Sequence, residues 1–214
     1  MIDFDWFSLI RNSTILKERR RKRLSIALDK IKYTKNSLIL DVGCGKKGKS
    51  LECFLKKNRI VGLDLHDPKD IDISHPKFGY IQADAENMHM FEKNEFDISF
   101  CIGVLEHITD KNKLRKITEE IKRVSKQYVI MVPHRYSIIE PHYKLPFFAF
   151  YPYDLKVSLT QLFNPLPYGN AVRSDPNFIK KDIHWLSEKE WKKYFPEAKM
   201  DFILFQYLLI TKRE

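Results

Sequence analysis

Residues 38–48 read Leu-Ile-Leu-Asp-Val-Gly-Cys-Gly-Lys-Lys-Gly, an apolar run that ends in a glycine-rich turn. The run predicts a buried strand. The turn predicts backbone that a ligand can approach closely, because Gly43 and Gly45 have no Cβ. At the carboxyl end of a parallel strand, such a turn is a nucleotide-binding position in α/β sheets. Residues 43–48 also have the dinucleotide spacing G-x-G-x-x-G, which is a weak signal by itself.

Acidic residues at the ends of predicted strands indicate which kind of nucleotide is bound. Asp41 ends the first strand, Asp64 ends the second and Asp84 follows the third. A carboxylate can accept two hydrogen bonds from a ribose diol, which suits Asp64, and Asp84 can accept from an adenine amino group. A fourth apolar run, residues 96–103, leads into Leu105-Glu106-His107.

This combination of motifs, over about residues 36–133, resembles the class I S-adenosylmethionine-dependent methyltransferases, in particular the small-molecule branch called methyltransferase type 11. The resemblance implies S-adenosylmethionine as cofactor and S-adenosylhomocysteine as product. It also implies a Rossmann-like, doubly wound α/β fold. Its seven-stranded sheet would be mostly parallel with an antiparallel last strand, and helices would cover both faces.

The resemblance also assigns roles to residues. The loop at residues 41–45 would wrap the methionine part, Asp64 would bind the ribose, and Asp84 with the backbone of Ala85 would read the adenine. Residues 102–106 would line the sulfonium side. The implied cofactor-binding residues are Asp41, Gly43, Cys44, Gly45, Asp64, Leu65, Asp84, Ala85, Ile102, Gly103 and Glu106. The family pattern G-C-G-x-G is altered, because Lys46-Lys47 move the last glycine to Gly48, and we expect a reshaped loop there.

Alternating strand and helix patterns predict a parallel sheet with helices on both faces. Expected strands are 38–42, 59–64, 78–83, 96–102 and 127–132, with closing strands at 200–205 and 206–211, and expected helices are 48–57, 86–91 and 110–125. A further helix is expected at 186–195, where Ser187 and Glu190 have the spacing of a capping box.

The predicted organisation is a helical N-terminal extension at residues 1–35, with its helix at 13–32, and a methyltransferase domain at 36–214. Within the domain, residues 134–184 form a substrate-side insert that is rich in proline and aromatic residues. No clear period is visible there. Long segments of this kind inside a domain are usually functional or mobile.

Catalysis of methyl transfer depends mainly on positioning, and a base is needed only when the acceptor loses a proton. The candidate bases are His107, His134, His142 and His184, with Tyr136 and Tyr143 as helpers. His107 has a second interpretation, because it could instead cap the helix that follows it.

The stretch at residues 133–148 resembles a Glu-Pro-His-x-x-Leu-Pro pattern found after the fifth strand in a subset of these methyltransferases. Glu140 and His142 are therefore the first substrate-side candidates, together with His107 and His134. The alternative is that Glu140 and His142 only join the insert to the sheet through hydrogen bonds.

Aromatic residues of the insert have two interpretations, as a lid over the acceptor or as the insert's own core. They are Phe147, Phe148, Phe150, Tyr151 and Tyr153. Residues 164–168, Asn-Pro-Leu-Pro-Tyr, resemble the motif of amino-group methyltransferases, but they lie far beyond the fourth strand and contain an extra leucine. We interpret them as a proline-rich turn.

The composition argues against a transmembrane protein, a secreted protein and a cysteine metal site. With 43% hydrophobic residues in 214, the chain can bury a sizeable core, and it has no apolar run long enough for a transmembrane helix. The N-terminus is unlike a secretory signal. Cys44, Cys53 and Cys101 lack C-x-x-C spacing, which indicates free thiols in a reducing compartment, hence a cytoplasmic protein, and no metal site is expected.

The net charge of +10 and the basic run at residues 17–23 raise the question of anionic partners. The run could bind RNA, or it could meet lipid headgroups while Phe4, Trp6, Phe7, Leu9 and Ile10 insert into a membrane. The favoured interpretation is a solvated helix that covers the cofactor cleft, so nucleic acid is not the favoured partner.

Three functions stay open at this point. The first is methyl transfer to oxygen or carbon of a small-molecule or a lipid- or glycan-linked acceptor. The second is RNA methylation, and the third is a non-catalytic S-adenosylmethionine-binding regulatory module. A monomer and a homodimer are both compatible with the sequence.

Overall fold

A seven-stranded sheet forms the frame of the computed structural model, which describes residues 14–45, 51, 58–71, 76–163 and 168–213. Its strand order is β3-β2-β1-β4-β5-β7-β6. The strands are β1 (Leu38–Val42), β2 (Arg59–Asp64), β3 (Phe78–Gln82), β4 (Phe96–Ile102), β5 (Ser125–Pro133), β6 (Lys199–Ile203) and β7 (Tyr207–Lys212). Strand β1 lies between β2 and β4, with Leu40 opposite Val61 and Ser99. The order therefore reverses beside β1, which is where open α/β sheets bind ligands.

All strand pairs from β3 to β5 are parallel, and β7 is antiparallel to both β5 and β6. The predicted fold, a mostly parallel seven-stranded sheet with an antiparallel last strand, is confirmed. β5 begins at Ser125, two residues before its predicted start, because the preceding helix ends at Val124.

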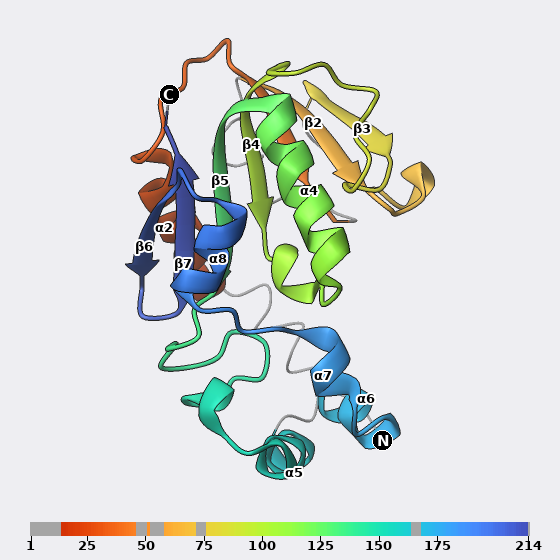
Figure 1. Ribbon diagram of the computed structural model, residues 1–214, viewed down its shortest axis with the longest axis vertical. Helices are drawn as coiled ribbons and strands as arrows, with labels where there is room; N and C mark the ends of the chain where they lie inside the picture. The colour runs from red at the N-terminus through yellow and green to blue at the C-terminus, as the bar shows by residue number, and fades with distance from the viewer. Residues whose placement is uncertain (1–13, 46–50, 52–57, 72–75, 164–167, 214) are drawn as a thin grey trace.

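Helices cover both faces of the sheet, as predicted (Figure 1). On one face α4 (Lys111–Val124) and α8 (Glu188–Tyr194) pack on the side chains of Leu40, Val42 and other alternate strand residues. On the other face α2 (Thr14–Leu28) packs on the intervening residues, such as Ile39. The period of two along each strand therefore divides the core into two layers.

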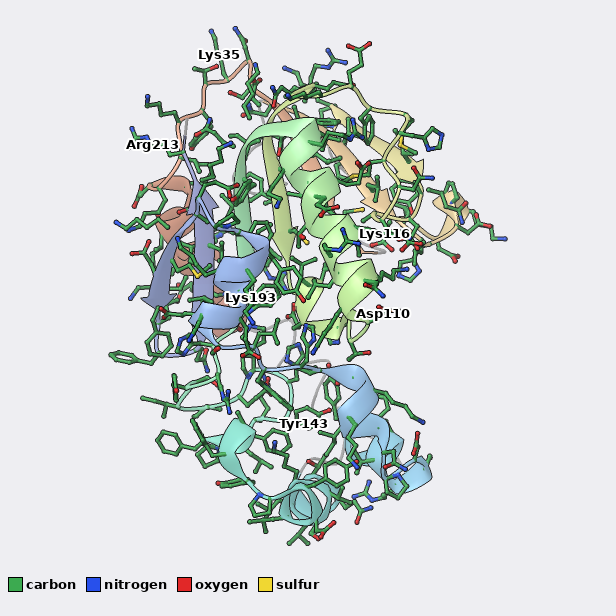
Figure 2. All side chains as sticks on the ribbon, in the orientation of Figure 1. Lys35, Asp110, Lys116, Tyr143, Lys193 and Arg213 are labelled. Carbon is green, nitrogen blue, oxygen red and sulfur yellow. The ribbon has the colours of Figure 1, made fainter. Side chains whose placement is uncertain are left out.

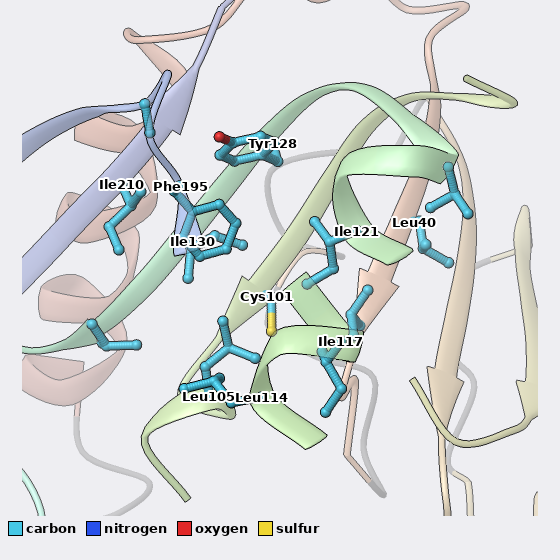
Figure 3. Packing of buried hydrophobic residues seen from close by; sticks show 14 of the residues in the cluster. Leu40, Cys101, Leu105, Leu114, Ile117, Ile121, Tyr128, Ile130, Phe195 and Ile210 are labelled. Atoms are coloured by element: carbon cyan, nitrogen blue, oxygen red, sulfur yellow. The ribbon is translucent and has the colours of Figure 1, made fainter. Parts of the chain in front are cut away.

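Helix α4 shows how the sequence produces the first layer. Leu114, Ile117, Ile121 and Val124 recur at helical spacing and are all buried. Figure 3 shows this row against Leu40, Cys101 and Ile130 of the sheet. The Asp110 carboxylate starts the helix by accepting hydrogen bonds from the amides of Asn112 and Lys113.

The predicted capping box of α8 is confirmed. The Ser187 hydroxyl accepts from the Glu190 amide, and the Glu190 carboxylate accepts from the Ser187 amide at 2.8 Å. The helix that this box begins places Trp191 in the same core layer as α4.

Helix α2 runs antiparallel to β5. The Arg23 guanidinium lies 4.5 Å from the ring centre of Tyr207, which pairs with Pro133 at the carboxyl end of β5. The Lys32 amide donates to the Gln127 side chain near the start of that strand. Arg20, Arg21 and Lys22 are exposed, as expected for a solvated basic helix.

Residues 1–13, with the apolar side chains considered for membrane insertion, lie outside the described residues. Within the described part of the chain, no helix is long and apolar enough to cross a bilayer.

The insert lies beyond the carboxyl ends of the strands, in the lower part of Figure 1. It contains α5 (Tyr153–Phe163), α6 (Tyr168–Ser174), α7 (Phe178–Asp182) and the 3₁₀ turn η3 (Phe148–Phe150). The sequence analysis did not predict these helices. Several of their apolar residues pack in a small core of their own, centred on Tyr143, Phe148, Val172, Ile179 and Ile183. Two of the helices are too short to display a period.

The aromatic residues of the insert divide between the two interpretations. Phe148 is buried and Tyr151 and Tyr153 pack against the insert core, which supports the core interpretation for these three. Phe147 and Phe150 are about half exposed, at 51% and 50%. Figure 2 shows Tyr143 within this lower part of the molecule.

One predicted helix is wrong. Residues 86–91 form turns, because side chains take the backbone groups that a helix would use. Glu120 accepts from the Met88 amide, and Arg123 donates to the carbonyls of Met88 and Phe91. The helix expected at 48–57 lies outside the described residues except for Leu51, and so do Lys46, Lys47, Gly48, Cys53 and residues 164–167.

Candidate active site

The glycine-rich loop after β1 is held against the loop after β4. Gly43 has a φ of +73°, and a Cβ at this position would lie 2.3 Å from Cγ2 of Val104. Its amide donates to the Leu63 carbonyl at 2.7 Å, which ties the loop to β2. Only glycine suits both the left-handed backbone and this close approach. A Cβ on Gly45, whose φ is +67°, would meet no atom of the described residues within 4 Å.

Asp64 joins the carboxyl ends of β1 and β2. Its Oδ2 accepts from the Gly45 amide at 2.8 Å, and its Oδ1 accepts from the Leu65 amide at 2.7 Å. Oδ1 also accepts from the His66 amide at 3.4 Å, whereas Oδ2 has one protein donor and can accept a further hydrogen bond from a ribose hydroxyl. Asp41 is buried at the end of β1. The Cys44 thiol is also buried, and its burial, together with the negative charges of Asp41 and Asp64, raises the pKa of Cys44 to about 12.

Asp84 is held by α4. Its Oδ2 is 2.6 Å from the Lys113 ammonium, and its Oδ1 accepts from the Glu86 amide at 3.1 Å. Partial burial acts to raise the pKa of Asp84, but these hydrogen bonds outweigh it and lower the pKa below its ordinary value. Asp84 is therefore an ionised acceptor next to half-buried Ala85, as an adenine-reading pair requires. Lys113 was not among the predicted site residues.

Glu106 lies in η2 (Leu105–His107), directly after the Gly103 turn that ends β4. Its side chain is only 2% exposed, and its Oε2 has no hydrogen-bond partner among the described residues. Burial raises the pKa of Glu106 to about 7, against the opposing effect of His142 and His107. Its Oε1 would lie 3.7 Å from a Cβ on Gly103, so the carboxyl group lies at the end of β4.

The insert places Glu140 and His142 against Glu106. Glu140 is fully buried and accepts from the amides of His142 and Tyr143 at 2.6 and 2.5 Å. Its Oε1 is also 3.0 Å from Nδ1 of His142, whose Nε2 is 3.9 Å from Glu106 Oε1. Nδ1–H therefore donates to Glu140, and Nε2 faces Glu106 Oε1.

His107 belongs to the same cluster. Its Nδ1 is 2.9 Å from the Asp182 carbonyl oxygen and 3.3 Å from Asp182 Oδ1, and its ring centre is 5.2 Å from that of His142. Burial acts to lower the pKa of His107, but Asp182 and Glu106 outweigh it and raise the pKa. His184 fixes the turn from outside, because its amide donates to the Glu106 carbonyl and its Nε2 donates to the Leu105 carbonyl.

His134 lies in a different environment. It is buried against Phe202, with ring centres 4.2 Å apart, and its Nδ1 accepts from the Tyr136 amide. Its Nε2 is 3.4 Å from Glu188, and burial lowers its pKa. None of these partners belongs to the cluster of Glu106, His107 and His142. Of the two tyrosine helpers, Tyr143 donates to Asp182 inside the insert, and Tyr136 stacks on Phe150.

The predicted site residues thus form two adjoining groups. The cofactor residues converge at the carboxyl ends of β1 to β4, and Glu140, His142 and His107 gather on Glu106. The sequence analysis missed Asp182, which contacts His107 across 75 residues of chain. Asp182 ends the short helix α7, where an acidic residue is common. No local sequence pattern therefore identifies it as the partner of His107.

Part of the chain is similar to known methyltransferases. A family model described as a methyltransferase domain matches residues 40–132. An uncharacterised protein of Methanocaldococcus jannaschii is 28% identical over 162 residues, covering 74% of this chain and 68% of that protein. The ubiquinone biosynthesis O-methyltransferase of Vibrio campbellii is 30% identical over 112 residues, covering 49% of this chain, and the match spans only 47% of that enzyme.

Among solved structures, the Burkholderia thailandensis 1,6-didemethyltoxoflavin-N1-methyltransferase, with bound S-adenosylhomocysteine, has a TM-score of 0.54. It is 12% identical, and the match covers 90% of this chain and 75% of that one, so it shows a shared fold. Residues 40–132 thus match a methyltransferase domain, and the sheet order is that of the methyltransferase fold, which is consistent with a class I S-adenosylmethionine-dependent methyltransferase.

Proposed function

We propose that the protein transfers a methyl group from S-adenosylmethionine to an oxygen or carbon atom of a small-molecule or a lipid- or glycan-linked acceptor. The observation that carries this proposal is the position of residues 102–107. Within this segment Val104 lies against Gly43 of the glycine-rich loop, and Glu106 and His107 lie against His142 and Asp182 of the insert. A donor in the cofactor site and an acceptor at the insert would meet across this segment.

The proposed reaction is an in-line displacement at the methyl carbon. The bond from the acceptor atom to the methyl carbon forms while the carbon–sulfur bond breaks, and the bonding electron pair stays on sulfur. S-Adenosylhomocysteine then leaves as a neutral thioether, and a hydroxyl acceptor loses its proton. Positioning supplies much of the rate in such a step, which suits a cluster held by buried hydrogen bonds.

The charge around the cluster favours a small acceptor over RNA. Glu106, Glu140 and Asp182 place three carboxyl groups around His107 and His142. A nucleic-acid site instead needs cationic side chains to neutralise phosphates. The exposed basic residues of α2 lie on one face of the sheet, whereas the insert lies at the carboxyl ends of the strands. The Vibrio campbellii relative, an O-methyltransferase, supports an oxygen acceptor.

A non-catalytic regulatory module is the competing function. Such a module needs a cofactor site, but it has no need for a buried carboxyl group aimed at a histidine on the acceptor side. The cluster of Glu106 with His107 and His142 therefore favours turnover over regulation.

Isothermal titration with S-adenosylmethionine, S-adenosylhomocysteine and NAD tests the first step. We expect micromolar binding of the first two and none of NAD; binding of NAD alone would overturn the proposal. Transfer of a labelled methyl group into extracted small molecules and lipids then tests turnover. Labelling of RNA alone would favour the RNA alternative, and cofactor binding with no labelled product would favour the module.

A further inference from the structure

Glu106, His107 and His142 bring three metal-binding groups together at the acceptor side of the site. One ligand atom from each lies within 4.8 Å of the others, and His142 Nε2 is 3.9 Å from Glu106 Oε1. Two ligands on an ion with bonds of about 2.1 Å lie roughly 3–4 Å apart, so only a small contraction would complete the site.

Both histidines form hydrogen bonds through Nδ1 of the kind that orients metal ligands. His142 Nδ1 donates to Glu140, and His107 Nδ1 donates to Asp182. In each ring Nε2 is then the nitrogen that can bind an ion, once it carries no proton. Metal-binding histidines usually donate their other ring nitrogen to a carboxylate or a carbonyl in this way. Glu140 is fully buried and is itself fixed by two backbone amides, so the orientation of His142 is rigid.

An independent observation is the unsatisfied oxygen of Glu106. This carboxyl group is buried, and although its Oε1 faces His142, its Oε2 has no hydrogen-bond partner among the described residues. A buried polar atom without a partner is destabilising. A bound cation would supply the missing partner, since both carboxylate oxygens can face an ion.

We infer that Glu106, His107 and His142 bind a divalent transition-metal ion such as Zn²⁺ or Fe²⁺. Two imidazoles and one carboxylate favour these ions over Mg²⁺ or Ca²⁺, which prefer oxygen ligands. Three protein ligands leave coordination positions open. Only the role of the ion rests on the proposed function: it would bind the oxygen of an acceptor hydroxyl and lower its pKa, so that the proton leaves to water before methyl transfer.

The expectation of no metal site considered only cysteine spacing. Its weakness is physical, because His142 reaches the Glu106-His107 pair from the insert, and a spacing of 35 residues is not a recognisable ligand pattern. The competing explanation is a metal-free hydrogen-bonded row in which Glu140 and Glu106 flank His142. Only the metal site predicts that Zn²⁺ binds saturably through Glu106 and His142.

The test is titration of EDTA-treated full-length protein with Zn²⁺ and Co²⁺, followed by calorimetry, the cobalt absorption spectrum and the thermal midpoint. We expect about one ion per chain and a spectrum typical of nitrogen and oxygen ligands. Glu106→Gln and His142→Ala should abolish saturable binding. Glu140→Gln, which acts through His142, should weaken it by about 10- to 100-fold. His89→Ala removes an exposed histidine elsewhere and should leave it unchanged.

Several outcomes would overturn the inference. A cobalt spectrum with thiolate bands would assign the ion to a cysteine, and equal binding by wild type and Glu106→Gln would assign it to the surface. Glu106→Gln replaces a carboxyl by an amide of the same shape, and its fold is checked through its circular dichroism spectrum and its thermal midpoint in the presence of EDTA. Cofactor binding without specific metal binding would defeat the metal site and leave the proposed function intact. Specific metal binding without cofactor binding would defeat the proposed function alone.

Discussion

The sheet with its glycine-rich loop and the insert at residues 134–184 build the two halves of the site in different ways. In the first, the cofactor residues end neighbouring strands, and the contact that joins them, Gly45 to Asp64, spans 19 residues. In the second, the contact between His107 and Asp182 spans 75 residues. The predicted cofactor residues are thus placed by strand order, whereas the proposed acceptor-side residues are placed by a separate small core.

The two cores also differ in composition. Most of the residues that bury the two faces of the sheet are aliphatic, and the backbone hydrogen bonds of seven strands add to its stability. The insert core has few fully buried residues and depends on aromatic packing around Tyr143 and Phe148, whose rings stack with centres 4.4 Å apart. We therefore expect the insert to be the less stable half.

The largest effect is expected from Phe148→Ala. Removing this fully buried ring should destabilise the insert by about 3–5 kcal/mol, because it leaves a cavity in a core too small to repack around it. Hydrogen exchange should show lost protection at residues 140–183 and unchanged protection in β1 and β4. The matched control is Phe150→Ala in the same turn, where the ring is half exposed and its loss should change little. Equal loss of protection in the sheet would show that the two halves unfold as one unit.

His142→Ala tests the separation of acceptor chemistry from cofactor binding. Because His142 contacts Glu106 and Glu140, we expect methyl transfer to fall by about 100- to 1000-fold. The affinity for S-adenosylhomocysteine should stay within about twofold, since none of the strand-end cofactor residues is changed. The measurement is the initial rate with an identified acceptor beside calorimetry of cofactor binding. A normal rate would return His142 to a structural role that joins the insert to the sheet.

Asp64→Ala is the matching change in the sheet half. It should weaken S-adenosylmethionine binding by about 100-fold, because the ribose hydroxyls lose a charged acceptor and Gly45 loses the group that fixes its amide. Asp70→Ala removes a nearby exposed carboxylate and serves as the control. Unchanged affinity by calorimetry would refute the assignment of Asp64 to the ribose.

The sequence predicted the sheet half of the site better than the insert half. The strands, their order and the acids at their ends were predictable, because apolar runs, glycines and caps act over a few residues. Glu140 and His142 were found through a pattern resemblance, but their contact with Glu106 and the role of Asp182 depend on the fold of the insert. The helix expected at 86–91 is wrong for a related reason, since side chains of α4 bind its backbone groups. Long-range polar contacts of this kind leave no local period.

The smallest effect is expected from Asp97→Asn at the opposite end of the sheet from the insert. Asp97 accepts from the Leu38 amide and from Lys126, each at 2.8 Å. Partial burial acts to raise the pKa of Asp97, but these hydrogen bonds outweigh it, so the folded pKa lies below the ordinary value of 3.8. A lowered folded pKa stabilises the fold above the unfolded pKa, and this contribution is lost as pH falls through the folded value.

Because the Asp97 side chain is partly exposed, solvent screens the pair, and the variant should be less stable than wild type by at most about 1 kcal/mol at pH 7. The side-chain amide oxygen of the variant can still accept from the Leu38 amide, so only the charged part is removed. Urea unfolding at pH 7 and at pH 3 should show the difference between wild type and variant shrinking at the lower pH, with cofactor binding and turnover at pH 7 unchanged. A difference that stays constant with pH would mean that the carboxylate charge contributes nothing to the sheet half. A loss of turnover would mean that the two halves are coupled through the sheet, contrary to the independence that their separate cores imply.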